Sequence, residues 1–545
     1  MGQQKSAGLS VSEARSKVSV IQGVPTAVAG FVIRARSGKV GTAVGVSTFT
    51  DFVAKYGEEI AGTFDWVAVE GFFRNARGAG QAQIVRTVHY IDDPDDQTGK
   101  MIVTGTKAHL NAKVSDENGA PDGVQFYAKD VGTYGNGLAV QISDSLETGA
   151  KKFAIGYPNA GNTALLSVIE TIDGVHLADD NDDPMDPADP SSFDSLFGND
   201  LDPDVSAKCA TINAKLLLSG GLRPTELLDG VYHLASGTDG TAPVEADYKG
   251  VNLISQKTGI YAFDFVKELA LLACPGMITP GMQNAMLEYA AARGDLFCVL
   301  DCPADLDESE IKAYVNGTGS GNNGTPLNSS YGAIYWPRII IQHPTTGKRT
   351  TVPSSGHVLG CYARTDDARG VWKVAAGTED GKILGAVGVE YEHVNLKEIR
   401  DVVYPNRINP IYVEPGYGTL IWGARTLDKT GEHRHINSRR TFIYAEKSVR
   451  ESHLWAVFEN IDGDLFDQIY PSVFTFLNGM RKDGGLKGKT PEEAFYIINE
   501  TTNSMEENGQ VRIRIGLATK KPAEFVEFVF EKDLRALLAE LGLKA

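Results

Sequence analysis

Apolar side chains follow two different periods near the start of the chain. Residues 48–57 and 63–76 place them at helical spacing, whereas residues 26–47 and 81–90 show the alternation and β-branched content of strands. A Ser-Gly pair divides the first of these strand segments into two strands joined by a turn. Helices and strands that alternate in this way pack in layers, so the pattern predicts a mixed α/β domain.

Helical spacing is missing between about residues 92 and 206. Alternating apolar segments, such as residues 125–131, 138–145 and 163–172, are separated there by turns rich in Gly, Asn and Asp. Helices and strands alternate again from about residue 207 onward, for example at residues 279–294. Because α/β patterns stand on both sides of the β-rich stretch, we interpret that stretch as an inserted, mostly β domain.

The β-rich stretch ends in an acidic segment, DDNDDPMDPADPSSFD. Asp179, Asn181 and Asp183 alternate there as the oxygen ligands of a calcium loop do. Pro184 stands where such a loop requires glycine, and no glutamate follows at the spacing of a bidentate ligand. We therefore expect a solvated acidic loop over about residues 179–204 rather than a metal site.

Both ends of the chain carry segments with the period of a strand. Near the N-terminus, the sequence SKVSVIQGV is preceded by nothing that could pack against it. Near the C-terminus, residues 509–519 and 522–532 alternate apolar and polar side chains, and an amphipathic tail follows. A strand without neighbours of its own can be satisfied by a partner chain, so both ends are suited to pairing with other molecules.

Length and charge narrow the class of protein. A chain of 545 residues favours about two to four domains. Its 52 Lys and Arg are outnumbered by 70 Asp and Glu, and the net charge of −18 argues against a nucleic-acid-binding surface. No apolar run approaches the roughly 20 residues of a membrane span, and the N-terminus lacks the apolar core of a signal peptide. The five scattered cysteines, including Cys298 and Cys302, predict buried, reduced thiols of a cytoplasmic protein.

The stretch RKDGGLKGKTPEEAF contains a Gly-Lys-Thr triplet of the kind that binds nucleotide phosphates. A phosphate loop requires glycine five residues before Gly488, and Asp483 stands there instead. Thr490, Pro491 and Glu493 fit the N-cap, first-turn proline and capping-box glutamate of a new helix. The preceding residues have helical spacing, so we predict a structural turn between two helices.

Other candidate sites are equally incomplete. Gly319, Gly321 and Gly324 match a dinucleotide pattern, but they follow a predicted helix rather than a strand, which indicates a loop. His433 and His435 could hold a metal on a strand, but their polar surroundings favour a solvated turn. No nucleophile elbow, zinc helix or cysteine ligand pair is present in the sequence. We therefore expect no catalytic, cofactor or metal site and no enzymatic activity.

Several long blocks of the sequence stand in a recognisable order. They are GVPTAVAGFVIRARSGKVGTAV, GFFRNARGAGQAQIVRTV, KDVGTYGNGLAVQI, ASGTDGTAPVEADYKG, YGAIYWPRIIIQHPTTGKRTTVPSSGHVLGCYARTDDARGVWKVAAG, INPIYVEPGYGTLIWGARTL and RRTFIYAEKSVRESHLWAVFENID. Together they resemble the tail sheath proteins of contractile injection machines, which include bacteriophage contractile tails and R-type tailocins. The resemblance covers most of the chain apart from the acidic β segment.

The resemblance implies a structural protomer without an active site or cofactor. Sheath proteins form six-fold rings stacked around an inner tube and contract to drive that tube through a target cell envelope. The implied partners are other copies of the chain, the tail tube protein, and baseplate and tail terminator proteins, with no nucleic acid and no direct membrane contact. The implied location is the tail of a virion or tailocin, assembled in the bacterial cytoplasm. The alternatives are another structural virion protein (tail tube, baseplate or capsid) and an enzyme of unknown type.

The resemblance also implies contact sites. Terminal arms would lend strands to neighbouring subunits, and the candidate arm residues are Val18, Ser19, Val20, Ile21, Phe525, Val526, Phe528 and Val529. The basic turn would contact an acidic tube through Arg481, Lys482, Lys487 and Lys489, although a plain solvated turn explains these residues equally well.

The expected fold class is α+β and multidomain. A mixed α/β tube-facing core would be built from both chain ends, with an inserted mostly-β outer domain and extended terminal arms. The expected divisions are an N-terminal arm (1–25), a middle α/β domain (26–91 and 207–365), the inserted domain (92–206), a C-terminal tube-facing core (366–517) and a C-terminal strand and arm (518–545).

Overall fold

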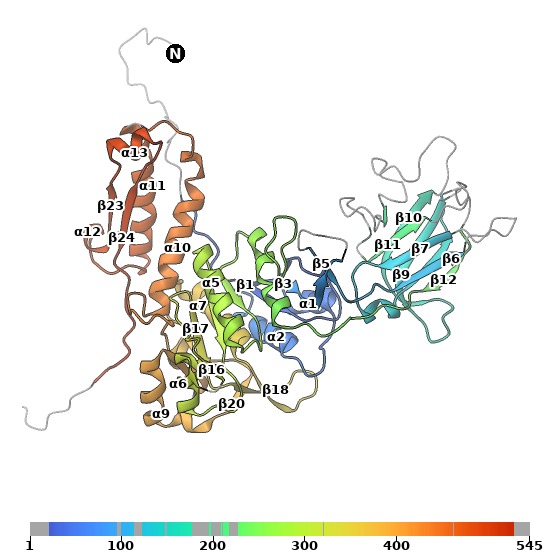
Figure 1. Cartoon of the computed structure of the whole chain (residues 1–545), viewed down its shortest axis with the longest axis horizontal. Coiled ribbons are helices and arrows are strands. Elements are labelled where there is room, and N and C mark those ends of the chain that lie inside the picture. The colour runs from blue at the N-terminus through green and yellow to red at the C-terminus, as the bar shows by residue number, and fades with distance from the viewer. Residues whose placement is uncertain are drawn as a thin grey trace, which may run out of the picture. The chain divides into compact units, whose positions relative to one another are not determined.

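Two compact units make up the chain. The computed structural model describes residues 21–94, 100–113, 123–147, 150–176, 196–197, 209, 211–216, 227–319, 321–461 and 463–527. One unit spans Ile21–Leu454, and the described part of the other runs from Trp455 to residue 527. The mixture of helices and several separate sheets confirms the expected fold class (Figure 1).

An eight-stranded sheet forms the centre of the larger unit. In spatial order its strands are β2 (Val44–Val46), β3 (Gln81–Arg86), β1 (Val28–Ile33), β13 (Leu271–Ala273), β14 (Phe297–Asp301), β17 (Gly332–Trp336), β21 (Ile408–Glu414) and β22 (Gly418–Ile421). The six inner strands are parallel, and both edge strands are antiparallel to their neighbours. Strands β1, β14 and β17 are buried along their whole length, as expected for parallel strands covered on both faces.

The N-terminal strand pair differs from the sequence prediction in its partners. Both expected strands are present, but β1 and β2 do not form a hairpin, because β3 lies between them and pairs with each. The predicted Ser-Gly turn is present, with Gly38 in the left-handed region at φ 99°. Two helices separate β3 from β2 in the sequence. The position of β3 in the sheet is therefore set by tertiary packing, which local periodicity does not record.

Helices and small sheets surround the central sheet (Figure 1). The helices are α1 (Phe49–Tyr56), α2 (Asp65–Ala76), α4 (Glu245–Lys249), α5 (Pro280–Arg293), α6 (Glu308–Asn316), α7 (Ser355–Arg369), α8 (Gly377–Asp380), α9 (Lys397–Val403) and α10 (Ile436–Ser452). The small sheets are β4 (Tyr90–Asp92) with β5 (Met101–Val103), β15 (Thr318–Gly319) with β16 (Asn322–Asn323), and β18 (Ile339–Gln342) with β19 (Arg349–Val352) and β20 (Ala386–Val389).

Helices α2 and α7 cross with unusually close backbones. A Cβ atom on Gly356 would overlap the carbonyl oxygen of Ala68, and one on Gly360 would overlap the carbonyl of Phe72. Glycine is therefore required at both positions on α7. The imidazole of His357, which is 1% exposed, fills the space beside the neighbouring turn of α2.

The burial of His357 makes the stability of the fold dependent on pH. Burial, and secondarily the charge of Arg74, lower the pKa of His357 to about 3. Since the unfolded imidazole titrates near pH 6.5, acidification below that pH protonates the unfolded chain first and lowers stability, by at most about 1.4 kcal/mol per pH unit. We expect His357→Gln to flatten the decline in urea midpoint between pH 6.5 and 4. The same change at the exposed His109 serves as the matched control for the substitution itself.

The β-rich stretch contributes to two facing sheets, but these sheets extend past the predicted end at residue 206, because two later strands pair with strands inside the stretch. One sheet runs β10 (Leu165–His176), β9 (Ala150–Pro158), β8 (Ala139–Asp144) and β12 (Gly230–His233), and the other runs β11 (Ile212–Leu216), β7 (Gly123–Ala128) and β6 (His109–Lys113). Phe126, Phe153 and Phe197 meet edge to face in a core separate from that of the central sheet. The acidic segment at 179–204 lies outside the described residues, except for 196–197.

Arg86 ties this β domain to the central sheet. Its side chain is 1% exposed, and the guanidinium donates to the carbonyls of Ala35 (2.9 Å), Gly38 (3.0 Å) and Val131 (2.9 Å). Val131 belongs to the β domain, whereas the other two acceptors follow β1. One buried side chain at the end of β3 therefore fixes the entry to the β domain.

The smaller unit consists of one long helix packed against a hairpin. Its elements are α11 (Gly463–Lys482), α12 (Pro491–Ala494), β23 (Phe495–Asn499), α13 (Asn503–Glu507) and β24 (Ile513–Leu517). Phe474 of α11 meets Phe495 of β23 with ring centroids 5.4 Å apart. The helix predicted before the basic turn and the strand predicted within residues 509–519 are both present.

Candidate interaction sites

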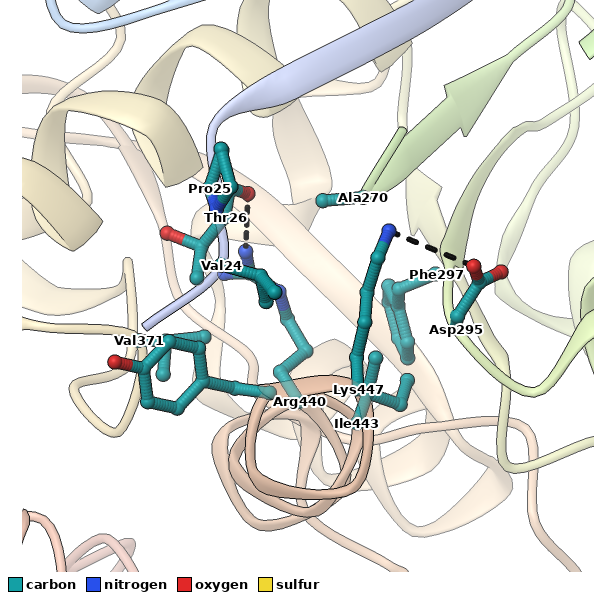
Figure 2. A pocket seen from close by; sticks show the side chains of 11 residues that line it. Val24, Pro25, Thr26, Ala270, Asp295, Phe297, Val371, Arg440, Ile443 and Lys447 are labelled. Atoms are coloured by element: carbon teal, nitrogen blue, oxygen red, sulfur yellow. Dashed lines mark hydrogen bonds and ion pairs between the residues drawn. The ribbon is translucent and has the colours of Figure 1, made fainter. Parts of the chain in front are cut away.

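Residues 21–26, the start of the described chain, lie along helix α10 (Figure 2). The backbone N–H of Val24 donates to Ser448 Oγ at 3.2 Å. Arg440 donates to the carbonyl of Thr26 at 3.2 Å. A Cβ atom on Gly23 would overlap the hydroxyl of Tyr444, so this segment approaches the helix as closely as a glycine permits. We call residues 21–26 the root segment.

Arg440 joins α10 to α7 through a buried ion pair. Its two terminal nitrogens donate to the carboxylate of Asp366 at 2.9 and 2.5 Å. The side chains are 6% and 2% exposed, and the guanidinium carbon also lies 4.8 Å from the ring centroid of Tyr362. Burial raises the pKa of Asp366, while the charge and hydrogen bonds of Arg440 oppose that rise. Two-point contact with a planar carboxylate fixes the orientation of α10 as well as its position.

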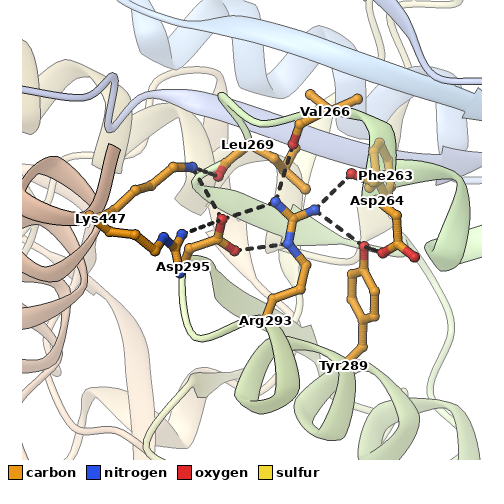
Figure 3. Close-up of polar contacts among 9 residues, drawn as sticks. Phe263, Asp264, Val266, Leu269, Tyr289, Arg293, Asp295 and Lys447 are labelled. Carbon is orange, nitrogen blue, oxygen red and sulfur yellow. Dashed lines mark hydrogen bonds and ion pairs between the residues drawn. The ribbon is translucent and has the colours of Figure 1, made fainter. Parts of the chain in front are cut away.

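Lys447 forms a second buried attachment, about two turns further along α10 (Figure 3). Its ammonium, on a side chain that is 2% exposed, donates to the carbonyl of Leu269 at 2.8 Å and lies 3.5 Å from Asp295. Asp295 is also held by Arg293 at 2.8 Å. Burial by itself would raise the pKa of Asp295. The hydrogen bonds of Arg293 and the surrounding positive charges outweigh this effect, so the net shift of the pKa is downward. The charged carboxylate of Asp295 therefore lies just before the start of β14 and faces Lys447 of α10.

A cavity of about 20 Å³ lies between the root segment, α10 and the sheet. Its walls include Thr26, Asp295, Phe297, Arg440 and Lys447 (Figure 2). Such a volume holds about one water molecule. The cavity is therefore too small for a substrate or cofactor.

The basic turn of the smaller unit brings the four predicted basic residues together. Arg481 donates to the carbonyl of Lys489 at 2.7 Å, which closes the turn. The backbone N–H of Lys487 donates to Ala518 beside β24 at 2.7 Å, while the side chains of Lys482, Lys487 and Lys489 are exposed. The stretch is a structural turn between α11 and α12, as predicted.

Two details of this turn differ from the sequence analysis. Pro491 opens α12 as expected, but Thr490 makes no side-chain cap bond, and Glu493 accepts from the backbone of Lys489 instead of completing a capping box. The left-handed Gly488, at φ 111°, turns the chain so that Lys489 rather than Thr490 meets the carboxylate. The sequence analysis also missed Lys520, whose ammonium lies beside Gly484 of the turn, 3.5 Å from where a Cβ on that glycine would be. Lys520 is far from the turn in sequence, so no local pattern indicated it.

The predicted arm residues are only partly described. Ile21 is 7% exposed within the root segment, and Phe525 and Val526 are 81% and 68% exposed beyond β24, where residues 521–527 form no strand. Val18, Ser19, Val20, Phe528 and Val529 lie outside the described residues. The sequence analysis did not single out the β23–β24 hairpin, a two-stranded sheet in which Tyr496 and Ile498 are each 49% exposed.

The remaining sequence motifs form no chemical site in the described part of the chain. The glycine pattern at Gly319, Gly321 and Gly324 belongs to the small β15–β16 hairpin rather than to a strand–helix junction. His433 and His435 meet no third metal-binding side chain there, and no cluster of three such groups occurs among the described residues. All five cysteines are buried, and burial raises the pKa of each thiol, as expected for unreactive core residues. Within the described ranges, every helix is too short or too polar to cross a bilayer.

Residues 255–427 match the family model of the phage tail sheath protein central domain. This segment is therefore similar to the central domain of phage tail sheath proteins. The matched segment contains helix α7 and five strands of the central sheet, namely β13, β14, β17, β21 and β22. No curated protein sequence matches the chain.

Solved sheath proteins share the fold along almost the whole chain. The sheath complex of PVC, an extracellular contractile injection system, in its contracted state has a TM-score of 0.55 and 16% identity, covering 98% of this chain and 100% of that chain. The contracted helical sheath of the anti-feeding prophage has a TM-score of 0.54 and 17% identity over 97% and 100%. A sheath tail protein from Listeria innocua has a TM-score of 0.57 and 10% identity over 92% and 96%. The resemblance to contractile sheath proteins is therefore confirmed.

Proposed function

We propose that this protein is the structural protomer of a contractile sheath, which polymerises as stacked six-fold rings around an inner tube and contracts to drive it through a target envelope. The observation that carries the proposal is the central-domain match within a fold that follows solved sheath subunits from end to end. The protein acts mechanically, without catalysis or cofactor. Its partners are other copies of itself, the tube protein, and baseplate and terminator proteins. It belongs to a virion or tailocin tail assembled in the bacterial cytoplasm.

Negative-stain microscopy of the purified protein tests this proposal against its alternatives. Striated hollow cylinders are expected of a sheath. Smooth thin tubes would indicate a tail tube protein, while dispersed particles would favour an enzyme or a baseplate component. Cylinders that dissolve on dilution and re-form on concentration would further establish that the chain itself supplies the lattice contacts.

The β23–β24 hairpin supports a role for the terminal arms. A two-stranded sheet is marginal by itself, and its outer edges are templates for further strands. We propose that the arms, centred on residues 18–21 and 525–529, add strands to this hairpin in neighbouring subunits. The exposed Phe525 and Val526 then become buried on assembly.

We propose that the basic turn contacts the tube. A sheath must hold its tube before contraction and release it during contraction. Exposed charge pairs therefore suit this contact better than a buried hydrophobic interface. Each such pair contributes about 0–1 kcal/mol and is screened by salt, but repetition on every subunit adds these contributions together. Arg481 closes the turn and thereby presents Lys482, Lys487 and Lys489 on one exposed loop.

Charge reversal at the turn should weaken the grip on the tube. We expect Lys487→Glu with Lys489→Glu to leave subunit folding intact and to favour contracted or empty sheaths over extended, tube-filled ones. High salt should shift wild-type assembly in the same direction. The matched control is Lys397→Glu with Lys373→Glu, a pair of changes in the other unit. Tube-filled sheaths at wild-type yield from the first variant would mean that the turn is merely solvated.

We propose the domain divisions given by the sequence, with residues 92–206 as the greater part of a peripheral insertion that continues to His233, because β11 and β12 complete its two sheets. Its separate aromatic core supports this division. Excision of residues 107–237, whose flanking Thr106 and Thr238 pair with each other, should leave a folded remainder with a short linker, as measured by solubility and thermal melting, because an insertion with its own core folds separately. An insoluble remainder together with an unfolded isolated insert would contradict the boundaries. The excision also removes Val131, whose carbonyl accepts a hydrogen bond from the buried Arg86. We therefore expect a modest loss of melting temperature.

A further inference from the structure

The root segment is held by groups that are themselves locked into the central sheet. Val24 and Thr26 bond to Ser448 and Arg440 of α10. Arg440 is paired with the buried Asp366, so any displacement of the root segment along its length pulls on that ion pair. The contacts lie within the larger unit and join residues far apart in sequence.

Helix α10 is also fixed at its second half. Lys447 is the neighbour in sequence of Ser448, and it bonds to Leu269 at the entrance to β13 and approaches Asp295 at the entrance to β14 (Figure 3). These are two adjacent parallel strands at the middle of the eight-stranded sheet. The polar path therefore runs from the backbone of the root segment, through α10, to the ends of two central strands.

We propose that the root segment and α10 form a clamp that carries tension from the N-terminal arm into the central sheet. The inference rests on the proposed function, because only a polymerised subunit has neighbours that pull on its arm. The bonds of Val24 and Thr26 to α10 resist peeling of the root segment from its own subunit. A clamp made of directional polar bonds resists sliding along the helix, which a purely apolar contact would permit.

Two single substitutions should open the clamp without leaving an unpaired charge. Ser448→Ala removes the acceptor of the Val24 N–H, and Gly23→Ala places a methyl group against the Tyr444 hydroxyl. Tyr444→Phe should rescue part of the effect of Gly23→Ala, because it removes the hydroxyl oxygen, the atom nearest the new carbon, and leaves ring carbons at 3.0 and 3.3 Å that a small ring movement can accommodate. Gly161→Ala is the matched control, since its Cβ would meet atoms only at 3.8 Å or more.

Hydrogen exchange of the unassembled subunit and shear of assembled polymers test the clamp together. We expect exchange at residues 23–27 to rise about two- to tenfold in Ser448→Ala and Gly23→Ala, and to return toward wild type with Tyr444→Phe. After a fixed dose of shear, polymers of the two opening variants should be shorter than wild-type and Gly161→Ala polymers.

Unchanged exchange in both opening variants would overturn the clamp. Faster exchange with wild-type polymer length after shear would overturn its role in carrying tension. If the wild-type protein forms no polymer at all, the proposed function fails and the tension role with it, whereas the exchange result still decides whether the root segment is clamped.

Discussion

We expect deletion of residues 1–20 to leave a soluble, folded subunit that no longer forms long polymers. The root segment is bonded to α10 by its own groups, so we expect the larger unit to keep its fold after the deletion. Each neighbour, however, loses a paired strand. Several backbone hydrogen bonds, worth roughly 0.5–1.5 kcal/mol net each, disappear per contact and are multiplied over the lattice.

Circular dichroism and thermal melting measure whether the deleted subunit is folded. Negative-stain microscopy measures the length of its polymers. A more specific variant is Val18→Pro with Val20→Pro, because proline cannot donate to a strand ladder. Val18→Thr with Val20→Thr is its control, since threonine favours strands and keeps the N–H. The proline variant should behave as the deletion does and the threonine variant as the wild type. Sheaths of normal length from the deleted protein would contradict the arm hypothesis.

Loss of the Asp366 carboxylate should be the most destabilising single change in the larger unit. Asp366→Ala leaves the buried Arg440 without its partner, and breaking a buried pair in this way costs about 3–5 kcal/mol. We expect the melting temperature of the subunit to fall by several degrees and the urea midpoint to decrease. Because Arg440 also holds Thr26, the root segment should loosen at the same time.

The comparison with two further variants separates the ion pair from its surroundings. Asp366→Leu with Arg440→Met removes both charges and should recover much of the stability, since an apolar replacement of a buried pair is often neutral. Asp401→Ala breaks an exposed pair with Lys397 and should change stability by no more than about 1 kcal/mol. Equal losses in Asp366→Ala and Asp401→Ala would show that burial does not control the energy of these pairs.

Long periodic segments could be predicted from the sequence with little error. The apolar spacing of residues 464–482 matches α11, and the apolar run around Cys298 matches β14, because both elements bury one face or the whole of their side chains. The turn at Gly488 could also be predicted, since proline is favoured in the first turn of a helix, where Pro491 stands. The partner of Glu493 could not be predicted, because it depends on the backbone turn at Gly488 rather than on residue type.

The sequence by itself therefore determined the element types, the absence of a complete catalytic motif and the resemblance to sheath proteins. Only the tertiary structure decided which elements meet. Arg and Lys side chains are mostly exposed in proteins, yet Arg440 and Lys447 are both buried, because Asp366 and Asp295 are brought to α10 from other parts of the chain. The position of β3 between β1 and β2 has the same origin. Periodicity reports which face of an element is apolar, whereas its partners are selected by packing across distances that no local pattern records.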